Sequence, residues 1–213
     1  MQNKRAATIL DRLTRRYPKA TTALAWRDAW GLLVATVLAA QCTDARVNQV
    51  TPTLFARWPD PASLAAAEVG EIEAVIRSTG FFRNKAKHLK AAAGMVAGRF
   101  KGAVPDRMED LLSLPGVARK TANIILSNAF GKNEGIAVDT HVKRLAFRLG
   151  LTESGDPAVI ERDLMPLFPC RAWGRVNHVL VWFGREVCAA RNPRCPDCEL
   201  ADVCPKRGVA GRG

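Results

Sequence analysis

The chain has 213 residues, which is enough for one large domain or two small ones with a real hydrophobic core. Hydrophobic residues make up 48% of the sequence and charged residues 24%, a composition that excludes a disordered chain. The 32 Lys and Arg exceed the 20 Asp and Glu, so the net charge is +12 and the pI is about 10.0. Such a charge favours a polyanionic partner, either nucleic acid or an anionic membrane.

The start of the chain, MQNKRAATILDRLTRRYP, is basic but has no apolar run before Asp11, so we expect no signal peptide. The longest apolar stretch, residues 30–40, is too short to span a bilayer and predicts a buried core helix. Nucleic acid is therefore the expected partner, and no membrane is expected. Without a secretory signal the six cysteines indicate a reducing compartment, where clustered thiols are more often metal ligands than disulfides.

Helical periodicity dominates the chain, and the alternation typical of strands is nearly absent. Apolar residues recur at helical spacing within residues 9–13, 32–39, 47–54, 72–76 and 89–96. We expect about ten helices and an all-α fold. Three aspartates next to prolines resemble helix starts: Asp60, Asp106 and Asp156.

Residues 105–130, PDRMEDLLSLPGVARKTANIILSNAF, predict a helix, a tight turn and a second helix. Asp106 is expected to cap the first helix, Pro115 and Gly116 form the turn, and the second helix begins near Val117 or Ala118. Backbone amides at the start of that second helix can bind a DNA phosphate without reading any base.

Lys120 falls in the first turn of the second helix, where the helix dipole is positive and carboxylates are the usual residues. One interpretation is a surface lysine that contacts phosphate. The other is a nucleophilic amine, whose pKa must fall from about 10.4 to roughly 7–8. The helix dipole supplies less than about one pKa unit, so desolvation in a pocket would have to supply most of that change.

The segment GIAVDTHVKRLAFRLG places Asp139 after an apolar run and at the start of a helix expected over residues 140–149. Asp139 either caps this helix or stabilises positive charge that develops on a sugar ring. For the adjacent His141 we expect a structural hydrogen bond.

Four cysteines close to the C-terminal end, Cys188, Cys195, Cys198 and Cys204, form the pattern C-x6-C-x2-C-x5-C. Structural zinc usually takes two C-x2-C pairs, so this single pair with two flanking thiols favours one [4Fe-4S] cluster, with zinc as the alternative. Arg191 and Arg194 lie between the first two thiols and form either a basic projection that grips phosphates or two solvated side chains. Core or surface packing is expected for Cys42 and Cys170.

Taken together, LPGVARKTAN, AVDTHV and the cysteine pattern resemble the endonuclease III family of DNA glycosylases, in the helix-hairpin-helix superfamily. The resemblance covers most of the chain and implies an all-α fold of two lobes. One lobe would be a six-helix barrel of residues 22–133 that contains the hairpin at about residues 106–130. The other would join residues 1–21 to residues 134–213 as an iron–sulfur cluster domain with its cluster loop at residues 188–204. DNA would lie between the lobes, with Lys120 and Asp139 facing each other.

The activity that the resemblance implies is that of a bifunctional DNA glycosylase and AP lyase of base excision repair. A damaged pyrimidine is flipped out of double-stranded DNA, Lys120 attacks C1′ to form a Schiff base, and β-elimination nicks the abasic site. Asp139 would assist base loss, and the cluster would be structural. We expect a monomer in the bacterial cytoplasm, associated with the nucleoid when bound to DNA.

Two alternatives remain: a monofunctional glycosylase for mismatched or alkylated bases, and a non-catalytic, redox-sensing protein that binds damaged DNA. Cluster-bearing adenine glycosylases typically have serine at the position of Lys120 and a further C-terminal domain. This chain has the lysine and ends nine residues after Cys204, so we expect the bifunctional enzyme.

Motif positions also imply DNA contacts. Gln41 in LAAQCTD matches the residue that fills the gap left by the flipped nucleotide, and Phe81 in STGFFRNKA replaces the usual leucine wedge. A polar helix end is the alternative for Gln41, and core packing is the alternative for Phe81. Further DNA contacts are expected at Leu114, Gly116, Ala118, Arg119, His141, Arg191 and Arg194.

Ala118 departs from the Gly-Val-Gly that the hairpin usually has in this family. If its φ must be positive, the alanine costs on the order of 1–2 kcal/mol. If the residue is helical, its methyl group narrows the approach of a phosphate. We therefore expect weakened DNA affinity.

Overall fold

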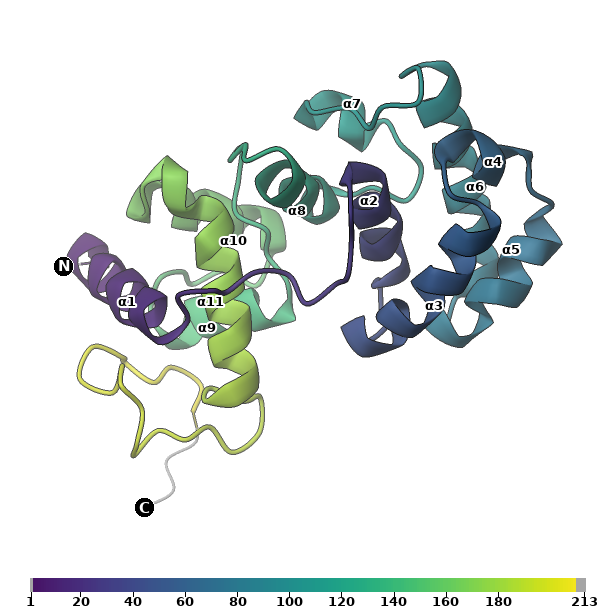
Figure 1. Cartoon of the computed structure of the whole chain (residues 1–213). Coiled ribbons are helices and arrows are strands. Elements are labelled where there is room, and N and C mark those ends of the chain that lie inside the picture. Colours follow the sequence, from purple (N-terminus) through teal and green to yellow (C-terminus); the bar gives the residue numbers. More distant parts are fainter. Residues whose placement is uncertain (1, 210–213) are drawn as a thin grey trace. The chain divides into compact units, whose positions relative to one another are not determined.

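The computed structural model describes residues 2–209, and these contain eleven α-helices, three short 3-10 helices and no strand (Figure 1). The prediction of an all-α fold is confirmed. The helices form two compact units. One unit contains Ala23–Lys132, and the other contains the segments before and after it.

The unit of Ala23–Lys132 is built around α2, whose residues from Trp30 to Leu38 are all buried. Because α2 packs against α3, α6 and α8, it is apolar on every side, as a helix in the middle of a core must be. The predicted core helix is thus confirmed, although it ends at Leu38 rather than at residue 40. The elements of this unit are α2 (Ala29–Leu38), α3 (Asp44–Arg57), α4 (Pro61–Ala66), α5 (Val69–Ile76), η1 (Arg77–Thr79), α6 (Phe82–Gly98), α7 (Met108–Leu112) and α8 (Arg119–Ala129).

The second unit packs α11 against α1 and α9, with apolar side chains such as Ile9, Leu145 and Phe183 buried in its core. Its helices are α1 (Gln2–Arg16), α9 (Thr140–Arg148), α10 (Pro157–Leu164), η2 (Met165–Leu167), η3 (Cys170–Ala172) and α11 (Trp173–Glu186). Residues 187–209 contain no helix and trace the yellow loops in Figure 1.

Two of the three predicted aspartate caps are confirmed. The Asp60 carboxylate accepts a hydrogen bond from the Ser63 amide at 2.8 Å, and that of Asp156 accepts from the first-turn amides of α10. The prediction for Asp106 is wrong, because α7 begins only at Met108 and the Asp106 carboxylate pairs with the Lys132 ammonium at 2.5 Å.

Within residues 2–209, every helix is too short or too polar to cross a membrane.

Candidate functional site

The predicted hairpin is present as α7, a turn and α8. Leu114 and Val117 are buried and anchor the turn, and the Val117 amide donates to the Leu114 carbonyl at 3.1 Å. Between them, Gly116 has a φ of +82°, and a Cβ added there would lie 3.0 Å from the Cβ of His88. Only glycine meets both demands. Since the Leu114 side chain is buried, any contact of this residue with DNA is limited to its backbone.

Ala118 precedes α8 in an extended conformation with a φ of −95°, so the alanine carries no left-handed strain. The remaining reason to expect weaker DNA binding is its exposed methyl group. Helix α8 begins at Arg119, which places Lys120 in its first turn as predicted, and both side chains are exposed. The first amides of a helix have no intrahelical acceptor, so they are available to an anion.

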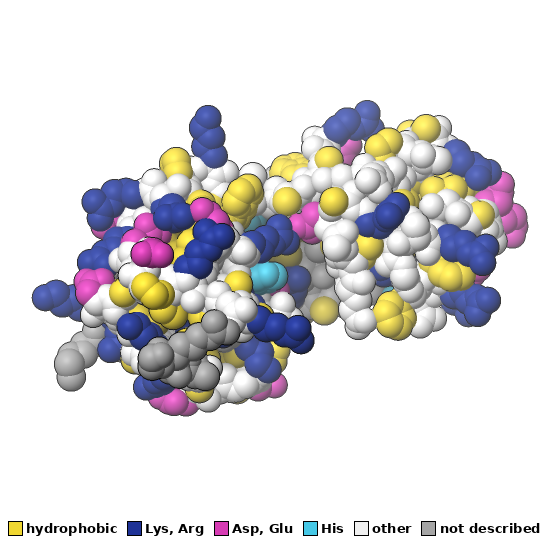
Figure 2. Space-filling view, turned by 90° about the horizontal axis from the view of Figure 1, so that it is seen from below, with side chains coloured by type: hydrophobic (Ala, Val, Ile, Leu, Met, Phe, Trp, Pro, Cys, Tyr) yellow, Lys and Arg dark blue, Asp and Glu magenta, His cyan; other side chains and the backbone are white. Residues whose placement is uncertain are grey.

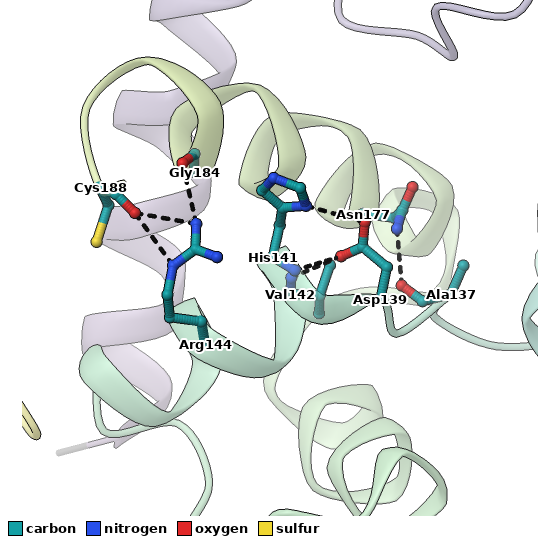
Figure 3. Close-up of polar contacts among 8 residues, drawn as sticks. All are labelled: Ala137, Asp139, His141, Val142, Arg144, Asn177, Gly184 and Cys188. Carbon is teal, nitrogen blue, oxygen red and sulfur yellow. Dashed lines mark hydrogen bonds and ion pairs between the residues drawn. The ribbon is translucent and has the colours of Figure 1, made fainter. Parts of the chain in front are cut away.

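Asp139 caps α9, and its hydrogen bonds appear in Figure 3. Its Oδ1 accepts hydrogen bonds from the amides of His141 at 2.9 Å and Val142 at 2.8 Å, and its Oδ2 lies 3.3 Å from Nδ1 of His141. The capping interpretation is therefore confirmed, and so is the structural partner expected for His141. The cap also fixes the direction of a carboxylate that keeps 19% of its side chain exposed.

The segment that leads into Asp139 is itself held in place. Ile136, Ala137 and Val138 are buried, and the buried Asn177 of α11 donates to the Ala137 carbonyl at 2.7 Å (Figure 3). Asn177 is not among the residues predicted from the sequence. Its only signal is a polar residue on the apolar face of a helix.

Lys120 and Asp139 belong to different units, so their facing across a DNA groove stays a prediction. Within its own unit, Lys120 lies in the first turn of α8, and Asp139 is the N-cap of α9.

Gln41 and Phe81 share an uncommon backbone conformation in the unit of Ala23–Lys132. Their φ angles are +52° and +47°, in the left-handed region that non-glycine residues rarely occupy. Both side chains are exposed, and 64% of Phe81 is accessible. Core packing for Phe81 is therefore wrong: the large apolar ring points into solvent on a strained loop.

Cys188, Cys195, Cys198 and Cys204 line one hollow in the second unit, together with apolar side chains such as Phe183 and Leu200. Hydrogen-bond donors point at two of the sulfurs: Nη1 of Arg148 lies 3.4 Å from the Cys188 Sγ, and the Lys206 amide lies 3.3 Å from the Cys204 Sγ. No three His, Cys, Asp or Glu side chains within residues 2–209 converge on a single ion.

Burial raises the pKa of the Cys198 thiol and that of the Cys204 thiol above the usual value for cysteine. Thiolates in this hollow therefore need a positive group beside them. The four thiols line the same hollow and hydrogen-bond donors lie beside two of the sulfurs, so the residues present fit a thiolate-bound metal group.

Two arginines of α9 that were not predicted as site residues hold the first part of the cysteine segment. Arg144 donates to the carbonyls of Gly184 and Cys188 (Figure 3), and Arg148 donates to those of Ala189 at 2.7 Å and Ala190 at 3.0 Å. Their i, i+4 spacing places them on one face of α9, but the sequence alone does not show which loop that face contacts. Arg191 and Arg194 follow this anchored stretch and are both exposed.

The two remaining cysteines lie outside the hollow. Cys42 is half-buried against the core of its unit, and Cys170 is exposed with its thiol 3.4 Å from the Asn133 carbonyl. Both positions agree with the packing roles expected for them.

Lysine and arginine side chains, dark blue in Figure 2, are spread over the visible face of both units rather than gathered in one patch. A protein with a net charge of +12 favours binding to a polyanion.

Residues 34–170 match the HhH-GPD superfamily of base excision DNA repair proteins. The chain is also 54% identical to endonuclease III of Synechocystis sp. over 204 residues, which is 96% of this chain and 93% of that protein. The chain belongs to the endonuclease III family.

Two solved structures of endonuclease III extend the similarity to three dimensions. One is a non-covalent complex of endonuclease III with DNA, with a TM-score of 0.92, 40% identity and coverage of 97% of this chain and 96% of that one. The other is a trapped covalent intermediate of endonuclease III with DNA, with a TM-score of 0.91, 40% identity and 97% coverage of both chains.

Proposed function

We propose that this chain is a bifunctional DNA glycosylase and AP lyase of base excision repair that removes oxidised pyrimidines from double-stranded DNA. The observation that carries the proposal is the position of Lys120, exposed in the first turn of α8 behind the hairpin turn. The similarity to an endonuclease III trapped covalently on DNA supports it, because such a trap requires a nucleophile.

Binding would begin at the hairpin. The turn at Gly116 and the first amides of α8 take a phosphate of the DNA backbone, which positions the duplex without reading its sequence. Gln41 and the exposed ring of Phe81 enter the duplex where a nucleotide is extruded, since apolar wedges unstack base steps.

The chemistry follows from a neutral amine beside an extruded sugar. The Lys120 nitrogen attacks C1′, the bond between C1′ and the base breaks, and the base leaves with the proton that the attacking amine gives up. A proton from water then goes to the ring oxygen as the bond between C1′ and that oxygen breaks, which opens the sugar and leaves a protonated Schiff base. Loss of a proton from C2′ to water then expels the 3′ phosphate. Water hydrolyses the imine and regenerates Lys120. Because Lys120 is exposed in the free protein, bound DNA supplies the desolvation that a nucleophilic amine requires.

Asp139 would stabilise the positive charge that develops on the sugar as the base leaves. Its two amide hydrogen bonds hold the carboxylate in one direction before substrate arrives, so the same bonds that cap α9 preorganise the charge.

The four cysteines would hold one [4Fe-4S] cluster, whose contribution is structural. With all four thiols bound to this cluster, the segment of residues 188–204 would form a fixed loop. This loop would present Arg191 and Arg194 to phosphates. A yellow-brown protein that contains iron and inorganic sulfide is expected, and a colourless protein that contains zinc would contradict this assignment.

Borohydride trapping tests the nucleophile. With a duplex that carries an abasic site, the unchanged protein should form a covalent adduct, and Lys120→Ala should lose the adduct but still bind the DNA. Lys87→Ala removes another exposed lysine and should trap normally. An adduct that persists in Lys120→Ala would assign the Schiff base to a different amine. A panel of duplexes with oxidised, mismatched and alkylated bases then defines the substrate.

A further inference from the structure

Lys85 of α6 is a buried lysine whose ammonium group donates hydrogen bonds to two backbone carbonyls. Only 5% of the residue is exposed, and its Nζ donates to the carbonyls of Leu38 and Thr79, each at 2.7 Å. Burial lowers the pKa of Lys85, an effect that the nearby Cys42 thiol opposes. A lysine is rarely buried without strong partners, because its desolvation is costly.

The two carbonyls end the two elements that lead into the strained loops, which are residues 39–43 with Gln41 and residues 80–81 with Phe81. Leu38 is the last residue of α2 and lies three positions before Gln41, and Thr79 is the last residue of η1 and lies two positions before Phe81. The final carbonyls of a helix lack intrahelical partners and favour a cation. One ammonium group therefore joins the bases of both loops.

The loops need such support. Gln41 and Phe81 are exposed, so burial of their side chains does not hold them in place. A left-handed backbone at a non-glycine residue is strained and persists only where the surrounding structure holds it in place. The Phe81 carbonyl also accepts from the Lys85 amide at 3.1 Å, so Lys85 contacts the base of the Phe81 loop through both backbone and side chain.

We propose that Lys85 is a positioning residue that clamps the Gln41 and Phe81 loops at a fixed spacing, so that both side chains enter the duplex together when a nucleotide is extruded. The inference rests on the proposed function. It assigns Lys85 to extrusion and not to the chemical steps, which belong to Lys120.

This proposal predicts different effects of a Lys85 variant on two substrates. Removal of a base from a duplex requires extrusion, whereas β-elimination on a single-stranded abasic oligonucleotide does not. Loss of the clamp should slow the first reaction and spare the second. A loss of general stability would slow both.

The variant Lys85→Met keeps the apolar stem and removes the ammonium group. Lys90→Met is the matched control, because Lys90 lies on the same helix and its Nζ donates to the Ala67 carbonyl at 2.6 Å, outside both loops. Both variants are measured for single-turnover excision from a lesion-containing duplex, for β-elimination on a single-stranded abasic oligonucleotide and for Tm. Fluorescence of 2-aminopurine placed beside the lesion reports unstacking directly.

For Lys85→Met we expect a roughly tenfold or greater fall in duplex excision, little change in single-strand cleavage and a weaker 2-aminopurine signal. Lys90→Met should leave the ratio of the two rates within about twofold of the parent. An unchanged ratio in Lys85→Met, or the same altered ratio in Lys90→Met, overturns the clamp.

If Lys85→Met does not fold, Lys85→Arg is measured in the same way. It keeps the charge but enlarges the group between the loops, so a reduced ratio is expected and an unchanged ratio again overturns the proposal. Failure of the proposed function is distinguishable, because the parent protein would then neither trap on abasic DNA nor cleave either substrate.

Discussion

Residues 23–132 and the cysteine segment of residues 187–209 are held together by different forces. In the first region a central helix is buried on all sides, and side chains such as Leu33 and Leu89 are fully buried. In the second, no helix forms and the four thiols are only half-buried, while Arg148 of α9 supplies hydrogen bonds to the loop. The first region is stable through burial, whereas we expect the second to need the proposed bound group for its stability.

The largest effect is expected from Cys198→Ser, which removes one of the four proposed ligands from the hollow. Loss of the bound group should remove on the order of 5 kcal/mol or more from the free energy of unfolding of the cysteine segment. Iron content, visible absorbance and protease cleavage within residues 188–204 measure this. Cys170→Ser changes an exposed thiol outside the hollow and should change none of them. Iron content equal to that of the parent would show that Cys198 is not a ligand.

The next largest effect is expected from Leu111→Ala, which removes a buried side chain of α7 and opens a cavity in the region of residues 23–132. The free energy of unfolding should fall by about 2–5 kcal/mol while iron content stays unchanged. Urea unfolding followed by circular dichroism measures the loss. Leu112→Ala is the neighbouring control, because Leu112 is 42% exposed and its truncation should cost less than about 0.5 kcal/mol. Equal losses in the two variants would contradict stabilisation by burial here.

The smallest effect is expected on the pH dependence of the free energy of unfolding, through His178 in the unit that carries the cysteine segment. Burial, with a further effect of Arg175, lowers the pKa of His178 to about 4. An unfolded histidine has a pKa near 6.5, so between pH 6.5 and pH 4 the unfolded state binds more protons. The free energy of unfolding therefore falls as the pH falls, by up to about 3 kcal/mol, and the loss is complete below pH 4.

His178→Gln should flatten the dependence of Tm on pH between pH 7 and pH 5, where visible absorbance monitors the cysteine segment in the same samples. His88→Gln changes an exposed histidine and should keep the slope of the parent. Parallel curves for the parent and His178→Gln would rule out burial of a neutral His178 as the source of the pH dependence.

Much of the candidate site follows from local rules. Helix caps, turns and periodicity depend on residues a few positions apart, so the all-α fold, the hairpin, the first-turn position of Lys120 and the cap at Asp139 were predicted. The same rules failed at Asp106, since Lys132, which lies 26 positions away in sequence, pairs with the carboxylate that was expected to cap α7.

The sequence by itself determined the candidate catalytic and metal-binding residues: the lysine behind a Pro-Gly turn, the capping aspartate and the four cysteines in one compact pattern. Only the tertiary structure decided what holds these residues in place. Lys85 joins two loops that lie about forty residues apart in sequence, and Arg144 of α9 reaches the end of α11. Such contacts leave no periodic signal, because backbone carbonyls accept hydrogen bonds whatever side chain they carry.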